Sequence, residues 1–234
     1  MTPVKTVPYA RVLNSISLRW IKLDWTSLDG SQLSLANEAI TTAVRYCYEF
    51  ALWNEARQIQ EITTVSNVVP WADIDNAPHF KVYDSEPRTP TSSAVEVEVV
   101  PVASGLRLTK RTLATVWVEF MPAAPDFNGL AQWVTATSYI VGDRVYFYTD
   151  AASPYYKRAF QCITAHTSAA AFATDAAKWV ELIVYECMSE AVTLLALADI
   201  LGNGEQERTQ AADLRQQAED KLNRNWIRTA SQDI

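Results

Sequence analysis

The sequence predicts an α+β fold with a helical bundle body, a β-sheet segment and an inserted small β module. Three observations predict this class. Helical periodicity dominates one long stretch near the start of the chain and a second stretch at its end. Alternation of apolar and polar residues, which is typical of strands, separates the two stretches. A second β segment, rich in aromatic residues, precedes the C-terminal helices.

The first long helix is expected at residues 35–62, with Ser34 as its N-cap. Its sequence, LANEAITTAVRYCYEFALWNEARQIQEI, contains no Gly or Pro and gathers apolar side chains on one face. Before it, SLRWIKLDWTSLDG is expected to form a short strand or turn that contains Trp20 and Trp25. This long helix would supply the N-terminal part of the helical body.

The β-sheet segment is expected to follow that helix. The alternation typical of strands occurs in HFKVYD, AVEVEVVPV and LRLTKRTLATVWVEF. The Pro-rich stretch SEPRTPTSS between the first two is expected to be a loop, and MPAAPDFNG an extended connector.

The inserted module is expected at residues 130–180, which leaves residues 1–129 and 181–234 as the body. Its aromatic-rich strands are separated by the turn sequence TDAASP. After the module, ELIVYECMSEAVTLLALADIL is helical, and GNG ends this helix because Gly favours helix ends. A last helix begins near Glu205 and Glu207 and carries a narrow apolar seam, which favours docking against partners.

Composition limits the classes of function. A formal net charge of −7 argues against wrapping nucleic acid as the main function of the whole surface. The three cysteines show no repeated spacing, so we expect no disulfide framework and a reducing compartment. The stretch MTPVKTVPYARVLNS lacks the apolar run of a signal peptide, and nothing approaches the ~18 apolar residues of a membrane helix. We therefore expect a soluble protein that is synthesised in the cytoplasm and does not contact a membrane.

No catalytic constellation is visible, and we expect neither an enzyme nor a bound metal or cofactor. Cys162 and His166 lie four residues apart, but His79 is the only other histidine and a tetrahedral zinc site needs three or four protein ligands. The expected roles of this pair are a buried strand cysteine and a loop histidine. GNGE follows a helix, whereas a dinucleotide-binding loop follows a strand.

Aromatic residues of the module give the alternative reading. Trp133 and Trp179 bracket the module, and Tyr146 and Tyr156 lie on its strands. Exposed aromatic rings on a small β platform commonly bind sugars, whereas buried ones form a core or a subunit contact. We treat these four residues as candidate contacts for a partner protein or a glycan.

The module resembles small chitin-binding-type modules. The resemblance rests on Trp133, Tyr139, the VGDRVYF stretch, the FQC strand and the closing Trp179. The following AHTS, with its later Phe, Asp and Trp, is instead similar to inserts in phage structural proteins. That second similarity favours a structural role over a lectin.

The rest of the chain resembles the head–tail adaptor proteins of tailed phages, also called connector or neck proteins. The strand and connector VWVEFMPAAPDF resemble those of this family. The same holds for the helix ECMSEAVTLLALADIL, the Gly turn and the helix GEQERTQAADLRQQAEDKLNR. The similarity lies in the pattern and the order of the elements.

The resemblance implies a virion protein of the neck that forms a homo-oligomeric ring, usually of twelve copies, between the portal protein and the tail. The ring would surround the DNA exit channel and touch the genome transiently during ejection. The C-terminal segment would bind the portal, which makes the candidate contact residues Asn223, Arg224, Trp226, Arg228 and Ile234. An acidic chain would let DNA slide, because Lys and Arg contacts to phosphates would hold it.

Two other classes stay open: another tail or capsid structural component, and a carbohydrate-binding or adhesion protein that uses the aromatic module. A sugar binder should present Trp133, Tyr146 or Trp179 side by side in solvent, whereas an adaptor should have these side chains packed. An enzyme would need a pocket with converging polar groups.

Overall fold

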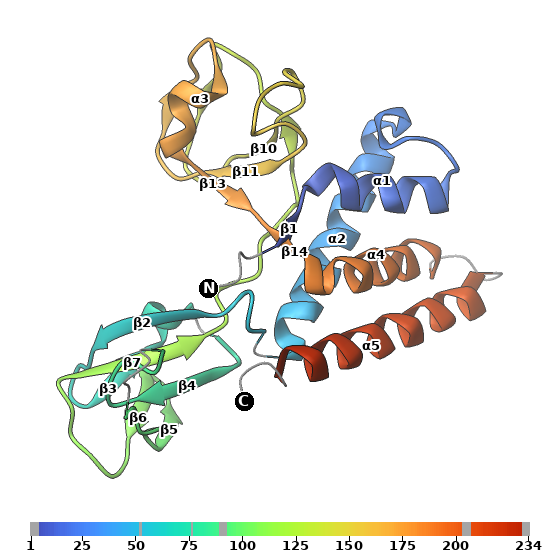
Figure 1. The fold of residues 1–234 in the computed structure, drawn as a ribbon. Helices are drawn as coiled ribbons and strands as arrows, with labels where there is room; N and C mark the ends of the chain where they lie inside the picture. Colours follow the sequence, from blue (N-terminus) through green and yellow to red (C-terminus); the bar gives the residue numbers. More distant parts are fainter. Residues whose placement is uncertain (1–4, 52, 76, 89–92, 203–206, 231–234) are drawn as a thin grey trace. The chain divides into compact units, whose positions relative to one another are not determined.

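The computed structural model describes residues 5–51, 53–75, 77–88, 93–202 and 207–230. The fold mixes helices with several small sheets, which confirms the α+β class. The chain forms two compact units, the first made of Met1–Cys47 and Pro125–Arg228, the second of Tyr48–Ala124 and Thr229–Ile234 (Figure 1). Within the described ranges, no helix combines the length and the apolar composition needed to cross a membrane.

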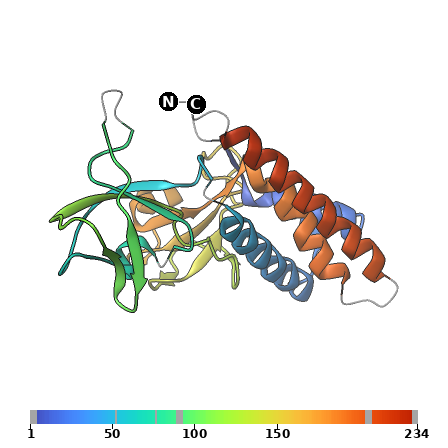
Figure 2. The ribbon, with the colours of Figure 1, turned by 90° about the horizontal axis from the view of Figure 1, so that it is seen from below.

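The first unit contains four long helices and a β module. The helices are α1 (Tyr9–Trp20), α2 (Gly30–Phe50), α4 (Glu186–Leu201) and α5 (Arg208–Ala230). Figure 1 shows α4 between α1 and α5, and Figure 2 shows the same order from below. Helix α4 is buried around most of its circumference, as expected of a helix that is apolar on all sides.

Two predictions about the N-terminal helices are wrong. Helix α1 was expected to be a strand or turn in part, yet it forms three turns that bury Leu13 and Ile16 fully. Helix α2 begins four residues before the expected cap Ser34, because Asp29 accepts hydrogen bonds from the backbone N–H groups of Ser31 and Gln32. The Gln32 side chain in turn accepts from the Asp29 N–H, which completes a reciprocal cap.

The expected continuation of the first long helix to residue 62 is also wrong, because α2 ends at Phe50. A turn closes at Trp53, whose carbonyl accepts from the N–H groups of Ala56 and Arg57. Residues Gln58–Thr63 then form strand β2, which pairs along its whole length with β7. Burial of Ile62 in a β core outweighs the weak helix propensity of this segment.

The β module consists of a four-stranded sheet in the order β13-β11-β10-β8 and a two-stranded sheet of β12 and β9. Its strands are β8 (Ala131–Gln132), β9 (Ser138–Tyr139), β10 (Arg144–Tyr146), β11 (Ala159–Cys162), β12 (His166–Thr167) and β13 (Trp179–Leu182). The short helices α3 (Phe172–Asp175) and η3 (Ala176–Lys178) lead into β13. A pair formed by β1 (Thr6–Val7) and β14 (Val184–Tyr185) leads into α1 and α4.

The C-terminal helix pair forms, but its first helix begins later than the expected residue 181. Trp179–Leu182 and Val184–Tyr185 are strands, and α4 begins at Glu186. Helix α4 ends at Leu201 with Gly202 as its C-cap, and the Gly202 N–H donates to the Ala198 carbonyl. The next helix, α5, begins at Arg208, whereas Glu205 lies outside the described residues. The end of α4 at Gly202 agrees with the prediction from the sequence.

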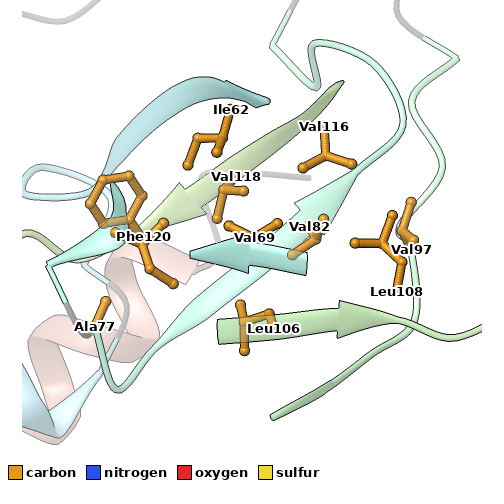
Figure 3. Close-up of a cluster of buried hydrophobic side chains, with 11 residues drawn as sticks. Ile62, Val69, Ala77, Val82, Val97, Leu106, Leu108, Val116, Val118 and Phe120 are labelled. Carbon is orange, nitrogen blue, oxygen red and sulfur yellow. The ribbon is translucent and has the colours of Figure 1, made fainter. Parts of the chain in front are cut away.

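The second unit is built from two three-stranded sheets, in the orders β2-β7-β4 and β3-β6-β5. Besides β2, these strands are β3 (Val68–Pro70), β4 (Phe80–Tyr83), β5 (Val99–Val102), β6 (Gly105–Leu108) and β7 (Thr115–Phe120). The second unit also contains the short 3-10 helix η2 (Trp71–Ile74), and the first unit contains η1 (Trp25–Ser27). Figure 3 shows the aliphatic side chains from both sheets that meet in its core. Gly105 is required where β6 meets β3, because a Cβ there would lie 1.9 Å from the Val69 carbonyl oxygen.

A buried carboxylate on β7 holds the outer face of the β2-β7-β4 sheet. Glu119 is 4% exposed, and its Oε1 lies 2.7 Å from Arg57 Nη1 and 3.3 Å from Arg88 Nη2. The Tyr83 hydroxyl donates to Oε2 at 3.4 Å. Burial, together with the charge of Glu119, raises the pKa of Tyr83 to about 12. Two guanidinium groups and one phenol therefore converge on this carboxylate.

Replacing this carboxylate should destabilise the second unit. In Glu119→Gln the guanidinium of Arg57, whose side chain is 13% exposed, loses its contact with the Glu119 carboxylate. We expect the free energy of unfolding to fall by about 3 kcal/mol. Glu98→Gln is the matched control, because its pair with Lys110 is exposed and should contribute less than ~1 kcal/mol. Hydrogen exchange of peptides from β2, β4 and β7 measures both effects. Equal protection in the two variants would contradict a structural role for Glu119.

Candidate functional site

The described part of the chain groups no set of metal ligands, and Cys162 and His166 do not form an activated pair. No group of three or more His, Cys, Asp or Glu side chains there could hold a metal ion. Cys162 Sγ lies 3.8 Å from His166 Nδ1, but both atoms also approach the Thr164 carbonyl oxygen, at 3.2 Å and 2.8 Å. His166 Nδ1–H donates to that carbonyl and cannot accept the thiol proton. Burial also raises the pKa of the Cys162 thiol, so this pair does not generate a thiolate.

The module's two tryptophans lie in its core. Trp133 is 4% exposed and Trp179 is 6% exposed. Both rings contact Phe172, with centroid distances of 5.7 Å and 5.6 Å. Phe160 approaches the same ring to 4.7 Å. Phe172 is thus the centre of an aromatic core, and the two tryptophans have no free face for a sugar ring.

A buried carboxylate fixes the loop that carries Phe172. Asp175 is 4% exposed and accepts hydrogen bonds from the Ala169 N–H at 2.6 Å and from Lys178 Nζ at 2.9 Å. The bond from Lys178 has the largest effect, and together the two bonds lower the pKa of Asp175 below its ordinary value of 3.8. Asp175 therefore ties the segment before α3 to the one after it.

The other two candidate aromatics lie on the opposite side of the module, against α1 and η1. The Tyr146 ring lies 6.4 Å from that of Tyr9 and 5.8 Å from that of Trp25. Tyr156 stacks on Tyr148 at 5.0 Å, and Tyr148 in turn meets the edge of Trp25 at 4.9 Å. Burial raises the pKa of Tyr146, and the hydrogen bond with Tyr156 raises that of Tyr148.

This second group, which we call the aromatic joint, contains Tyr9, Trp25, Tyr146, Tyr148 and Tyr156. It connects the module to the N-terminal helices, and the Ala10 N–H adds a backbone bond to the Lys157 carbonyl. The four candidate residues of the module are therefore divided between two clusters, one in its core and one in the joint. Trp25 and Tyr148 were not singled out from the sequence. The consecutive aromatic residues Tyr146, Phe147 and Tyr148 could have indicated packing on both faces of β10, because successive side chains of a strand point to opposite faces.

The C-terminal candidates lie on the last turns of α5. Asn223 and Arg224 are exposed, whereas Trp226 is half-buried. The side chain of Arg228 and the whole of Ile234 lie outside the described residues. The structure adds Ile227, which is 67% exposed and lies beside Arg224 and Trp226.

An exposed Ile at the end of a polar helix is a signal of a contact that sequence reasoning missed. The helix itself is well anchored at this end, because Asn225 Nδ2 donates to the Cys187 carbonyl of α4 at 2.5 Å. Leu222 is fully buried one turn earlier. Ile227 is thus presented on a fixed helix.

Comparison of the chain with known protein families, with curated protein sequences and with solved structures gives no significant match.

Loss of the Asp175 carboxylate should weaken the module. In Asp175→Asn the charge-assisted bond to Lys178 is lost, and we expect the free energy of unfolding to fall by about 1–3 kcal/mol at neutral pH. Because the folded pKa is lowered, this contribution is present above 3.8 and is lost as the pH falls through the folded value. The two proteins should therefore become equally stable in acid, as urea unfolding followed by near-UV circular dichroism can measure.

Glu38→Gln is the matched control, because Glu38 is exposed on α2. We expect it to change stability by no more than about 0.5 kcal/mol at any pH. If Asp175→Asn and the control had the same free energy of unfolding at every pH, the Asp175 carboxylate would be dispensable for stability.

Proposed function

We propose that the chain is a structural virion protein that forms a ring of twelve copies between the portal and the tail of a tailed phage. In this proposal the helices form a bundle that serves as the ring body and lines the DNA exit channel. Residues 130–180 form a module that faces a neighbouring neck or tail component. The protein performs no catalysis and resides in the virion neck after synthesis in the host cytoplasm.

Burial of the module's tryptophans is the observation that carries this proposal. A sugar platform needs at least two rings with free faces in solvent, and Trp133 and Trp179 are instead packed around Phe172. Tyr146 is half-buried in the aromatic joint. All three side chains that discriminate the two functions therefore support an assembly protein over a lectin.

The geometry of α5 supports a terminal contact with a partner. The helix buries only a narrow seam that includes Ala211, Ala218 and Leu222. It exposes Ile227 in its last turns, next to the charged side chain of Arg224. An aliphatic side chain combined with Arg is a common core of a protein–protein contact. We therefore assign the portal contact to the end of α5.

The test uses the full chain with a cognate portal ring and compares wild type with Ile227→Asp and Arg224→Glu. We expect wild type to add the mass of twelve copies to the portal ring, and each variant to bind on the order of tenfold more weakly. Native mass spectrometry or mass photometry measures the added mass. Substitutions are used in preference to a chain truncated after Lys221, because that truncation would also remove the buried Leu222.

Thr209→Asp is the control, since Thr209 is exposed at the other end of α5. It should load the portal like wild type. A wild-type chain that leaves the mass of the portal ring unchanged would refute the proposed function. Titration with chitin oligosaccharides, followed by tryptophan fluorescence, would then test the carbohydrate alternative.

A further inference from the structure

Helix α1 carries an unpaired basic stripe. Arg11 and Arg19 are exposed on α1, and Lys22 is exposed just beyond its end. No Asp or Glu occurs among residues 1–23, although the whole chain has a net charge of −7. Among the described residues, neither Arg11 nor Arg19 forms an ion pair.

The stripe borders a shallow groove between α1 and α4. The groove has a volume of about 160 Å³, and Arg11 and Arg19 line it opposite Glu186 and Glu190. These glutamates already have partners: Lys5 Nζ lies 4.0 Å from Glu186 and Lys221 Nζ lies 2.8 Å from Glu190. Within the part of the chain that the structure describes, neither guanidinium group forms an ion pair with these glutamates, so both can bind a carboxylate of another chain.

Helix α5 carries the complementary stripe. Asp213 and Asp220 are exposed and lie on the side of α5 away from the buried Ala211 and Ala218. Gln216 of the same helix donates to Asp220, which leaves that carboxylate available to further donors.

The two stripes also match in length. At about 1.5 Å per residue, Arg11 and Arg19 are separated by about 12 Å along α1, and Asp213 and Asp220 by about 10 Å along α5. Two charge pairs can therefore form at once when the helices lie side by side.

The two stripes lie on different surfaces of the same layer of helices. Helix α4 lies between α1 and α5 (Figure 1). It is bonded to α5 through Arg215 and Asp199, and through Lys221 and Glu190. A single protomer cannot bring its own stripes together across α4. Two different, complementary surfaces of one protomer define a head-to-tail interface, which can repeat and close into a ring.

We propose that the basic stripe of α1 (Arg11 and Arg19) binds the acidic stripe of α5 (Asp213 and Asp220) of a second copy of this chain. The inference rests on the proposed ring and names the contact that closes it. Each protomer donates one stripe to each neighbour. The contact is electrostatic, so it sets the order and orientation of the copies and weakens as salt rises.

The test is a charge swap between two variants of the full chain. One variant, Arg11→Glu with Arg19→Glu, has two acidic stripes; the other, Asp213→Lys with Asp220→Lys, has two basic stripes. Each variant alone should repel itself, whereas an equimolar mixture can alternate. We expect the apparent dissociation constant of self-association at low salt to rise on the order of tenfold in each variant, and to return toward the wild-type value in the mixture.

Sedimentation velocity over a range of protein and salt concentrations measures these constants. Arg45→Glu, an exposed charge on α2, is the control and should associate like wild type. A mixture that sediments as the average of its two components, or a wild type that never associates, would overturn the inference. Charge variants that load a portal ring as well as wild type would overturn this contact alone, because the portal complex would still support the proposed function.

Discussion

Helix α4 imposes the main constraint on the first unit, because it is apolar around nearly its whole circumference and cannot remain in water. Leu194, Ala196 and Leu197 are successive or nearly successive residues, yet all are buried. Such a helix must be covered on several sides, and α1 and α5 flank it while α2 approaches through Cys47, which lies near Cys187. Burial of Cys47 raises its pKa, which marks this contact as an apolar one. The outward faces of α1 and α5 therefore end up on different surfaces of one layer.

The β module is held by two aromatic clusters with different roles. The cluster around Phe172 is the module's own core, and it buries both tryptophans that a lectin would expose. The aromatic joint instead connects β10 to α1 and η1, through the contacts of the Tyr146 ring with Tyr9 and with Trp25.

Much of the fold could be predicted from the sequence, and the errors have definite causes. Strands β4 to β7 of the second unit were predicted from alternation, whereas β2 was expected to be helical and β3 was not predicted. The end of α4 at Gly202 was also predicted. Helix α1 was missed, although Tyr9, Leu13, Ile16 and Trp20 follow helical spacing. The start of α2 was misplaced because Asp29 and Ser34 are both acceptable N-caps, and the reciprocal bond from Gln32 favours Asp29.

The sequence by itself determined the elements whose patterns have one solution: the buried α4, the alternating strands and the Gly-terminated helix. Tertiary structure decided the ambiguous cases. Residues Gln58–Thr63 continue a helical pattern, but pairing with β7, more than fifty positions away, makes them a strand. On β10 and just beyond it, Tyr146, Phe147 and Tyr148 are consecutive aromatic residues, so both faces are equally apolar in the sequence. Only the position of α1 and Phe172 decides that Phe147 enters the core while its neighbours join the helices, because packing partners distant in the chain provide the burial.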